Sequence, residues 1–188
     1  GFAPQIEEIM KRVPKTRQTL LFSATMPRAI LKLASEHMSM PIHIEVAPSG
    51  TTVEFVNQEV YVMRKEDKYR QLEKILKEYN GSVLVFARTK YGAKHLTNNL
   101  KQSGHQAAEI HSNLSFNQRK EALAGFKNKK YRILIATDIA ARGIDVSGIE
   151  LVVNYDLPDN SEDYVHRIGR TARAGKQGKA ISFATPDQ

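Results

Sequence analysis

Short apolar runs alternate with amphipathic stretches along the chain from about residue 53 onward. The run Val83–Phe86 consists of four apolar residues, which is typical of a strand buried on both faces of a parallel sheet. Residues Glu66–Tyr79 carry apolar side chains at helical spacing, and Asn80-Gly81 follows them as a common helix stop. Further strands are expected at about 53–62, 107–110, 132–136, 150–154 and 179–183, and further helices from Thr89 to Gly104 and from Ser115 to Phe126. Strands that alternate with helices predict an α/β fold, in which helices cover both faces of a parallel sheet.

The first part of the chain has a pattern of its own and ends at a boundary. A strand is expected at Leu20–Phe22, an amphipathic helix from about Pro27 to Met38, and a short strand at Ile42–Val46. The residues that follow are small and polar and include proline and glycine, as is typical of a linker. We therefore expect one domain over residues 1–46, a linker over residues 47–52 and a second domain over residues 53–188.

The chain of 188 residues carries 28 basic and 20 acidic residues, which gives a formal net charge of +8. Such an excess serves solubility as often as it marks a polyanionic partner, so both interpretations stay open. Residues 64–78 mix both signs, as a solvated helix would, whereas the basic excess gathers in the C-terminal half. The chain has no cysteine, no apolar run of membrane-spanning length and no histidine pair at metal-ligand spacing. We expect a cytoplasmic protein with no membrane partner and no bound structural metal.

An arginine-rich segment, Tyr164–Gly178, carries Arg167, Arg170 and Arg173 at intervals of three residues. A bare repeat of this kind is most often a solvated helix face. Here two glycines interrupt the helix, which places the arginines at a helix end and on the loop after it. Planar guanidinium groups that point into a cleft can grip phosphate oxygens with two hydrogen bonds. We predict that this segment binds an anion, specifically a nucleotide phosphate.

Polar and basic residues recur just past the expected strand ends, at the edge where open parallel sheets bind ligands. Turn or cap chemistry explains each of them alone, but their shared placement favours a site. They are Arg88-Thr89-Lys90, His111-Ser112-Asn113, Thr137-Asp138 and Tyr155-Asp156.

A glycine-containing segment, Ala141–Asp145, follows one of these strand ends. Gly143 allows the backbone to approach a ligand closely, and the Asp145 carboxylate can accept hydrogen bonds from ribose hydroxyls. A tight turn with a local pair between Arg142 and Asp145 is the alternative. The chain has neither a phosphate-binding loop of the form G-x-x-x-x-G-K-[ST] nor an acidic cluster placed to hold magnesium. It therefore lacks two parts that a complete nucleotide hydrolase needs.

Four motifs follow one another along the chain, namely Ser23–Pro27, Val85–Lys90, Ala136–Asp138 with Ala141–Asp145, and Tyr164–Thr171. Their order and spacing resemble the C-terminal motif series of the DEAD-box RNA helicases, and the resemblance covers essentially the whole chain. It implies two RecA-like lobes: residues 1–46 would be the end of the first lobe, and residues 53–188 most or all of the second. The ATP-cradling loop and the DEAD motif itself would lie upstream, outside this chain.

The resemblance implies roles for several residues at the nucleotide. Arg170 and Arg173 match the arginine fingers that act on the γ-phosphate of ATP. His166 and Arg167 match contacts between the lobes that link hydrolysis to closure. The segment Gly143–Asp145 matches a part of the family that binds ATP, with Asp145 as the carboxylate on the ribose. ATP and Mg²⁺ would be held mainly by the missing part of the first lobe.

The resemblance also implies contacts to RNA. Thr89, Arg119 and Thr137 match residues that contact the sugar-phosphate backbone, which predicts little sequence preference. Ser23 and Thr25 match the motif that couples ATP hydrolysis to strand separation.

Two positions depart from the family pattern. Ala172 replaces a usual glycine, which affects only the local loop shape. Phe116 stands where the family usually has glutamine, three residues before Arg119. One polar contact to the RNA backbone or between the lobes is therefore expected to be absent.

The resemblance implies the C-terminal lobe of an ATP-dependent RNA helicase, with RNA and the first lobe of the same protein as partners. This chain alone should neither hydrolyse ATP nor unwind duplexes. Two alternatives remain open: a non-catalytic module that binds RNA or docks a partner, and a DNA helicase or translocase of the same superfamily, which the string 166–173 disfavours. Residues 1–46 expose apolar faces that nothing in the chain is designed to bury. This predicts local disorder, non-native docking on the second lobe, or self-association through an exposed strand edge.

Overall fold

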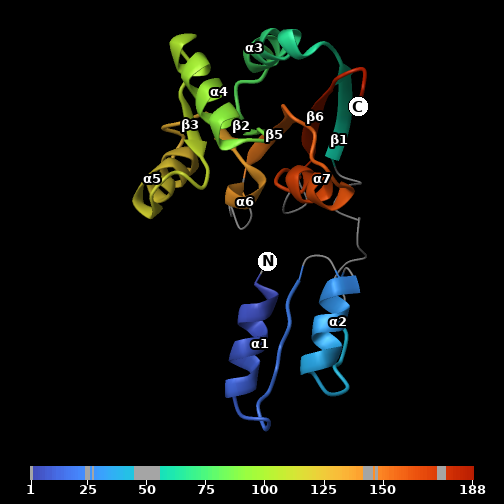
Figure 1. Ribbon diagram of the computed structural model, residues 1–188. Coiled ribbons are helices and arrows are strands. Elements are labelled where there is room, and N and C mark those ends of the chain that lie inside the picture. Colours follow the sequence, from blue (N-terminus) through green and yellow to red (C-terminus); the bar gives the residue numbers. More distant parts are fainter. Residues whose placement is uncertain are drawn as a thin grey trace. The chain divides into compact units, whose positions relative to one another are not determined.

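The structure is a computed structural model, and it describes residues 2–23, 26, 28–44, 56–141, 146, 148–172 and 177–188. The chain divides into two compact units, Gly1–Ser49 and Gly50–Gln188 (Figure 1). None of the described helices is both long enough and apolar enough to cross a membrane.

The second unit is built on a six-stranded sheet with the order β1-β6-β5-β2-β4-β3. Its strands are β1 (Val56–Val62), β2 (Ser82–Phe86), β3 (Ala107–Ile110), β4 (Ile133–Ala136), β5 (Ile149–Asn154) and β6 (Gly178–Ala184). All neighbouring strands pair in parallel. The edge strand β1 pairs with β6, the last strand in the sequence, in the register Val56↔Gly178. The α/β fold with a parallel sheet is therefore confirmed, and the expected residues 53–55 of the first strand lie outside the described part.

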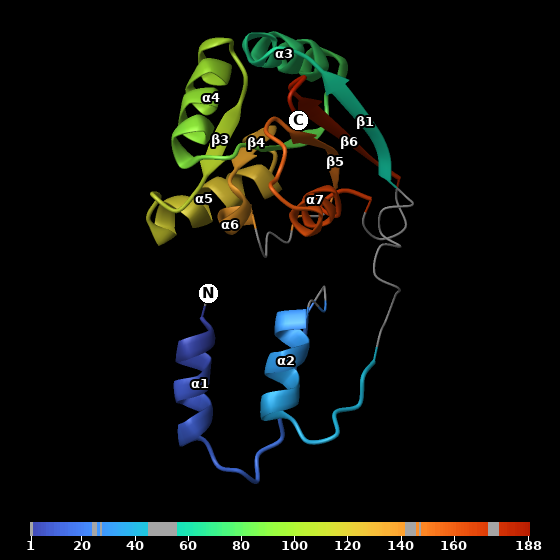
Figure 2. The same ribbon diagram turned by 45° about the vertical axis from the view of Figure 1, so that its right-hand side comes forward.

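Helices cover both faces of this sheet, with α3 and α4 on one side and α5, α6 and α7 on the other (Figure 2). They are α3 (Lys68–Glu78, preceded by a 3-10 turn at Lys65–Asp67), α4 (Lys90–Gln102), α5 (Phe116–Lys127), α6 (Asp138–Ala141) and α7 (Ser161–Ile168). Alternate strand residues enter the two cores: Val83 and Val85 pack with α3 and α4, and Leu84 and Phe86 lie in the opposite core.

Side-chain caps fix the points at which several helices begin. The Thr89 hydroxyl accepts a hydrogen bond from the Gly92 backbone N–H at 2.9 Å, at the start of α4. Ser115 and Gln118 form a reciprocal capping box at the start of α5, as the sequence predicts. The Asn160 side chain accepts from the Asp163 N–H at 2.8 Å and caps α7. These helix starts follow β2, β3 and β5, so the caps order the carboxyl edge of the sheet.

The first unit contains two helices, α1 (Ala3–Arg12) and α2 (Arg28–His37). Of these, only α2 is expected from the sequence. The helix α1 is not expected; it has Pro4 in its first turn and carries an ion pair between Glu8 and Arg12 at 3.0 Å. The strand expected at Leu20–Phe22 is wrong, because no described residue of this unit forms a ladder with it and a strand needs such a neighbour. The strand expected at 42–46 is likewise absent over residues 42–44, and residues 45 and 46 lie outside the described part. Phe22 is 90 % exposed, and Leu20 and Ile42 are exposed as well.

Candidate functional site

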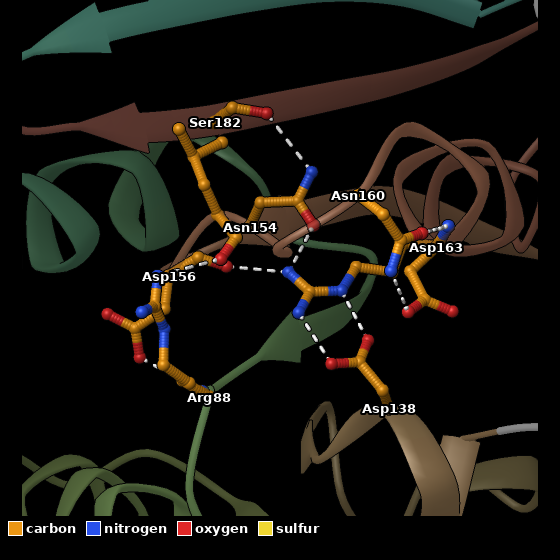
Figure 3. A network of polar contacts seen from close by, with 9 residues as sticks. Arg88, Asp138, Asn154, Asp156, Asn160, Asp163 and Ser182 are labelled. Carbon is orange, nitrogen blue, oxygen red and sulfur yellow. Dashed lines mark hydrogen bonds and ion pairs between the residues drawn. The ribbon is translucent and has the colours of Figure 1, made fainter. Parts of the chain in front are cut away.

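Arg167 lies at the centre of a buried polar network at the carboxyl edge of the sheet. The residue belongs to α7 and is only 2 % exposed. Its Nε and Nη2 both donate to the Asp138 carboxylate, with 2.8 Å between Nη2 and Oδ2. Its Nη1 donates to Asn154 Oδ1 at 3.1 Å and to the Asp156 carbonyl at 2.6 Å. The Asn154 amide in turn donates to Ser182 Oγ at 3.0 Å, so the network reaches β6 (Figure 3).

This network, in which Arg167 binds Asp138, Asn154 and Asp156, is called the Arg167 clamp below, and it fixes α7 to the sheet. The Arg167 guanidinium also lies 4.9 Å from the centre of the Phe86 ring, so one side chain contacts the ends of β2 and β5 and the start of α6. One turn earlier on α7, the Tyr164 hydroxyl donates to Gln58 Oε1 of β1 at 2.8 Å. Two tethers from neighbouring turns of a helix restrict its rotation, which makes α7 a rigid support for the residues that follow it.

Arg170 and His166 lie beside this clamp. Together with Asp163, Ala141 and parts of the Arg167 network they line a small hollow of about 10 Å³, room for roughly one water molecule. His166 Nε2 is buried and has no hydrogen-bond partner among the described residues. Leaving a polar group buried and unsatisfied costs roughly 1–3 kcal/mol, and nothing in the described part of the unit offsets that cost for His166 Nε2.

A second set of contacts holds the loop between β2 and α4. Asp156 Oδ2 accepts from the Arg88 backbone N–H at 3.0 Å, and its Oδ1 lies 3.4 Å from Lys68 Nζ. Lys68, which is 4 % exposed, also donates to the Tyr155 carbonyl at 2.9 Å. Burial, and secondarily the charge of Asp156, raises the pKa of Tyr155 to about 12. These bonds hold Arg88 in place and thereby position the adjacent Thr89.

Thr89, Thr137 and Arg119 come from the carboxyl ends of three neighbouring strands, β2, β4 and β3, and the helices after them. Thr89 is exposed, whereas Thr137 and Arg119 are half-buried. The Lys90 ammonium donates to Asn113 Oδ1 at 3.0 Å and so joins the loop after β2 to the loop after β3. Arg119 Nε is buried without a hydrogen-bond partner in the described part of the chain. The edge therefore gathers hydroxyl and guanidinium donors on one surface, as phosphate binding requires.

A family model described as the helicase conserved C-terminal domain matches residues 67–175. Over 186 residues the chain is 46 % identical to the ATP-dependent RNA helicase DbpA of Bacillus subtilis. The matched region covers 98 % of this chain and 39 % of DbpA. Over 189 residues it is 44 % identical to the DEAD-box ATP-dependent RNA helicase CshA of Streptococcus pneumoniae, covering 100 % of this chain and 36 % of CshA. This chain belongs to the DEAD-box helicases. It spans less than half of the length of these relatives.

Solved DEAD-box structures share the fold. The structure of S. cerevisiae Dbp5 bound to RNA and ADP BeF3 matches with a TM-score of 0.87 at 32 % identity, over 98 % of this chain and 49 % of that one. A DEAD box protein from Methanococcus jannaschii matches with a TM-score of 0.69 at 42 % identity, over 100 % of this chain and 50 % of that one. The parallel sheet with helices on both faces is thus the RecA-like fold of a DEAD-box C-terminal lobe.

Some of the DEAD-box motif residues fall outside the described part of the chain. They are Thr25, Gly143, Asp145 and Arg173. Ser23 is described and lies exposed in the first unit. The roles that the resemblance implies for these residues remain predictions.

The structure changes the interpretation of two basic residues in the DEAD-box lobe. From the sequence, all three arginines of the 164–178 segment are expected to point into a cleft. The guanidinium of Arg167 instead makes its hydrogen bonds to residues of the same unit. Lys68 belongs to a stretch of mixed charge that the sequence analysis takes for a solvated helix, yet it is buried. Its partners at Tyr155 and Asp156 are distant in sequence, so charge pattern alone could not find it.

Sequence reasoning also missed the structural role of Asn154. This residue is fully buried and joins Arg167 to Ser182. A signal was present, because Asn154 ends an otherwise apolar strand run, and a buried amide needs hydrogen-bond partners on both its oxygen and its nitrogen.

Proposed function

We propose that the second unit is the C-terminal lobe of an ATP-dependent RNA helicase and that it contributes to both the ATP site and the RNA site of the whole protein. The observation that carries this proposal is the clamp around Arg167, which joins the RNA-side residue pair Thr137-Asp138 to the helix that presents His166 and Arg170. One rigid element thus lies between two sets of anion-binding groups.

In this proposal the first lobe holds ATP, and Arg170 approaches its γ-phosphate when the lobes close. Phosphoryl transfer spreads negative charge over the transferred group, and a guanidinium fork stabilises that charge with two parallel hydrogen bonds. Arg173, two residues after Thr171, is proposed as the second finger. The Gly143–Asp145 segment is proposed to contact the ATP ribose. The clamp around Arg167 makes this chemistry effective, because a support that is already ordered needs no reorganisation in the transition state.

His166 is proposed to complete its hydrogen bonding across the lobe interface. Its buried and unpartnered Nε2 supports this role. The described residues hold no cluster of three potential metal ligands, so we assign the Mg²⁺ ligands to the first lobe. Magnesium neutralises phosphate charge when it is bound there.

Thr89, Arg119 and Thr137 are proposed to hold the sugar-phosphate backbone of RNA. A hydroxyl donates to a phosphate oxygen, and the guanidinium of the half-buried Arg119 can donate several hydrogen bonds. Backbone contacts carry no sequence information, so binding should tolerate many sequences, and contacts to 2′-hydroxyls would separate RNA from DNA. The structural match to Dbp5 in complex with RNA and ADP BeF3 supports a lobe of this shape in such a complex.

Residues 1–46 are proposed to be the end of the first lobe, joined by the linker 47–52 to the second. The exposed Leu20 and Phe22 support this, since the preceding part of a RecA-like lobe would cover them. Ser23 and Thr25 would then couple hydrolysis to strand separation in the complete protein. In the chain by itself the same surfaces are proposed to associate with a second copy or with the second unit.

The deciding experiment measures ATP hydrolysis by this chain joined to the first lobe of its own protein, with single-stranded RNA, with DNA of the same sequence and with no nucleic acid. We expect turnover that RNA stimulates and DNA does not, and no turnover by the 188-residue chain alone. Equal stimulation by DNA would favour the DNA translocase, and the absence of turnover with RNA binding retained would favour a non-catalytic RNA-binding module. Turnover by the isolated chain would contradict the division of the site between two lobes.

A further inference from the structure

Two aromatic side chains stand exposed at the carboxyl edge of the sheet. Tyr91 is 71 % exposed in the first turn of α4, and Phe116 is 72 % exposed as the first residue of α5. They are the most exposed of the described aromatic residues in this unit, whereas Phe86, Phe126 and Phe183 are buried. Neither ring is therefore needed to fill the core of the unit.

The two residues belong to one surface. Lys90 Nζ donates to Asn113 Oδ1 at 3.0 Å and lies 5.3 Å from the centre of the Tyr91 ring. The start of α4 thus contacts the loop that leads into α5, three residues before Phe116. Between β2 and β3 lies β4, and the residue three positions after it, Ile139, is a third exposed apolar side chain. Each of these three neighbouring strands is therefore followed, within six residues, by an exposed apolar or aromatic side chain.

The charge around this surface is positive. Lys94 on α4 and Lys120 on α5 are exposed, and Arg119 follows Phe116 by one helical turn. The acidic residue next to Lys120, Glu121, has Lys130 as an ion-pair partner at 4.0 Å. Exposed aromatic faces among cations suit a partner that carries both anionic groups and flat rings. Single-stranded nucleic acid has this chemistry, because its phosphates bind cations while its bases stack on aromatic side chains.

We propose that Phe116 and Tyr91 stack on bases of the same RNA strand whose backbone Thr89, Arg119 and Thr137 hold. This inference rests on the proposed RNA function and adds a contact of a different kind to it. Phe116 has no polar group with which to hold the backbone, so its contribution comes from the ring face. Because every base has a π face, the contact strengthens binding with little dependence on sequence.

The test uses the 188-residue chain and a single-stranded RNA in which one base is 2-aminopurine, whose fluorescence falls when it stacks. In Phe116→Leu the side chain stays apolar and the ring is lost, and in Phe116→Trp an aromatic ring is kept. Stacking by one aromatic residue is worth roughly 5- to 150-fold in affinity.

We expect Phe116→Leu to lose at least about fivefold in RNA affinity and to abolish the fluorescence quenching, and Phe116→Trp to retain both. Tyr91→Leu should lose less than about fivefold in RNA affinity, because the Tyr91 ring also faces Lys90. Val62→Ala, at an exposed apolar position on β1, serves as the matched control and should bind as the unchanged chain does.

An abasic RNA of the same length separates this inference from the proposed function. Stacking predicts that the unchanged chain and Phe116→Leu bind the abasic strand equally, and that Arg119→Gln weakens binding to both strands. If Phe116→Leu matches the unchanged chain on normal RNA while Arg119→Gln binds weakly, the stacking contact is refuted and the backbone function stands. If the unchanged chain binds no RNA, both are refuted, and the aromatic surface belongs to a protein partner.

Discussion

Arg167 and Asp138 form a bidentate ion pair that joins α7 to the residue directly after Thr137. Thr137 is proposed to contact RNA and Arg170 the γ-phosphate, so under this proposal the pair links the residues that bind the two ligands. If binding of either ligand displaces α6 or α7, the displacement must alter the geometry of this ion pair.

Removing one partner of this pair should destabilise the second unit. In Arg167→Leu the Asp138 carboxylate and the Asn154 amide lose their buried partner, which costs about 3–5 kcal/mol for buried pairs. We expect a value near the lower end, because the Asp138 side chain retains 28 % exposure. Urea unfolding measures the change. Lys130→Gln, which removes the exposed partner of Glu121, is the control and should change stability by less than about 1 kcal/mol.

Arg170→Ala in the two-lobe protein should reduce ATP turnover by roughly 10³- to 10⁵-fold, as the loss of an arginine finger does in related phosphoryl-transfer enzymes. Arg170→Lys should restore little, because an ammonium group cannot reproduce the bidentate fork. RNA affinity should remain within about twofold, because Arg170 is proposed to contact the γ-phosphate and not the RNA. Single-turnover ATP hydrolysis and RNA titration check the two parts separately. Near-normal turnover by Arg170→Ala would remove Arg170 from the catalytic site.

Thr89 combines a helix cap with a proposed RNA contact, and substitution can separate the two. Aspartate is also a good N-cap, so Thr89→Asp should leave the stability of α4 nearly unchanged. Its negative charge should weaken RNA binding by about 1 kcal/mol, or about fivefold, at a separation near 4 Å in water. Gln102→Glu places the same charge at the far end of α4, beyond the Debye length of about 10 Å at 0.1 M salt, and should have little effect. Equal weakening by both variants would show that only net charge matters.

Stability should fall between about pH 10 and pH 12 as Tyr155 becomes ionised in the unfolded chain. Its pKa in the folded protein is raised to about 12, chiefly by burial. In that window the unfolded state has released the proton and the folded state still holds it, so rising pH favours unfolding. A shift of this size corresponds to about 2–3 kcal/mol. Thermal unfolding of Tyr155→Phe should show a smaller loss over the same range, though Tyr69, whose pKa is raised by burial as well, leaves part of the effect.

The exposed apolar side chains of the first unit should make the isolated chain associate as its concentration rises. Sedimentation velocity is expected to show a monomer at low concentration and larger species above it. Amide exchange at residues 18–22 should be fast in the monomer, because these residues form no strand ladder with any described residue. Slow exchange there in a dilute sample would contradict this expectation. Joining the first lobe should abolish the association.

The sequence predicted the sheet because its strands are short apolar runs with clear stops, and Val83–Phe86 is buried as such a run should be. The capping box at Ser115 was equally readable, since both partners lie within four residues. Contacts between residues far apart in the sequence could not be predicted in this way. The burial of Lys68 depends on a carbonyl and a carboxylate at the end of a different strand. The strand expected at Leu20–Phe22 failed for the same kind of reason, because local propensity cannot supply the neighbouring strand on which a ladder depends.

The pairing of β1 with β6 has a consequence for how the protein is made. A ribosome produces β1 early and β6 last among these strands, and β1 lies at the edge with no other ladder partner. The backbone N–H and C=O groups of β1 therefore cannot form their ladder hydrogen bonds until residues 178–184 have been synthesised. Until then the nascent chain exposes an unpaired strand edge to other chains. The duration of this exposure depends on the rate of translation and not on the stability of the folded unit. Slow codons just before residue 178 would lengthen that exposure.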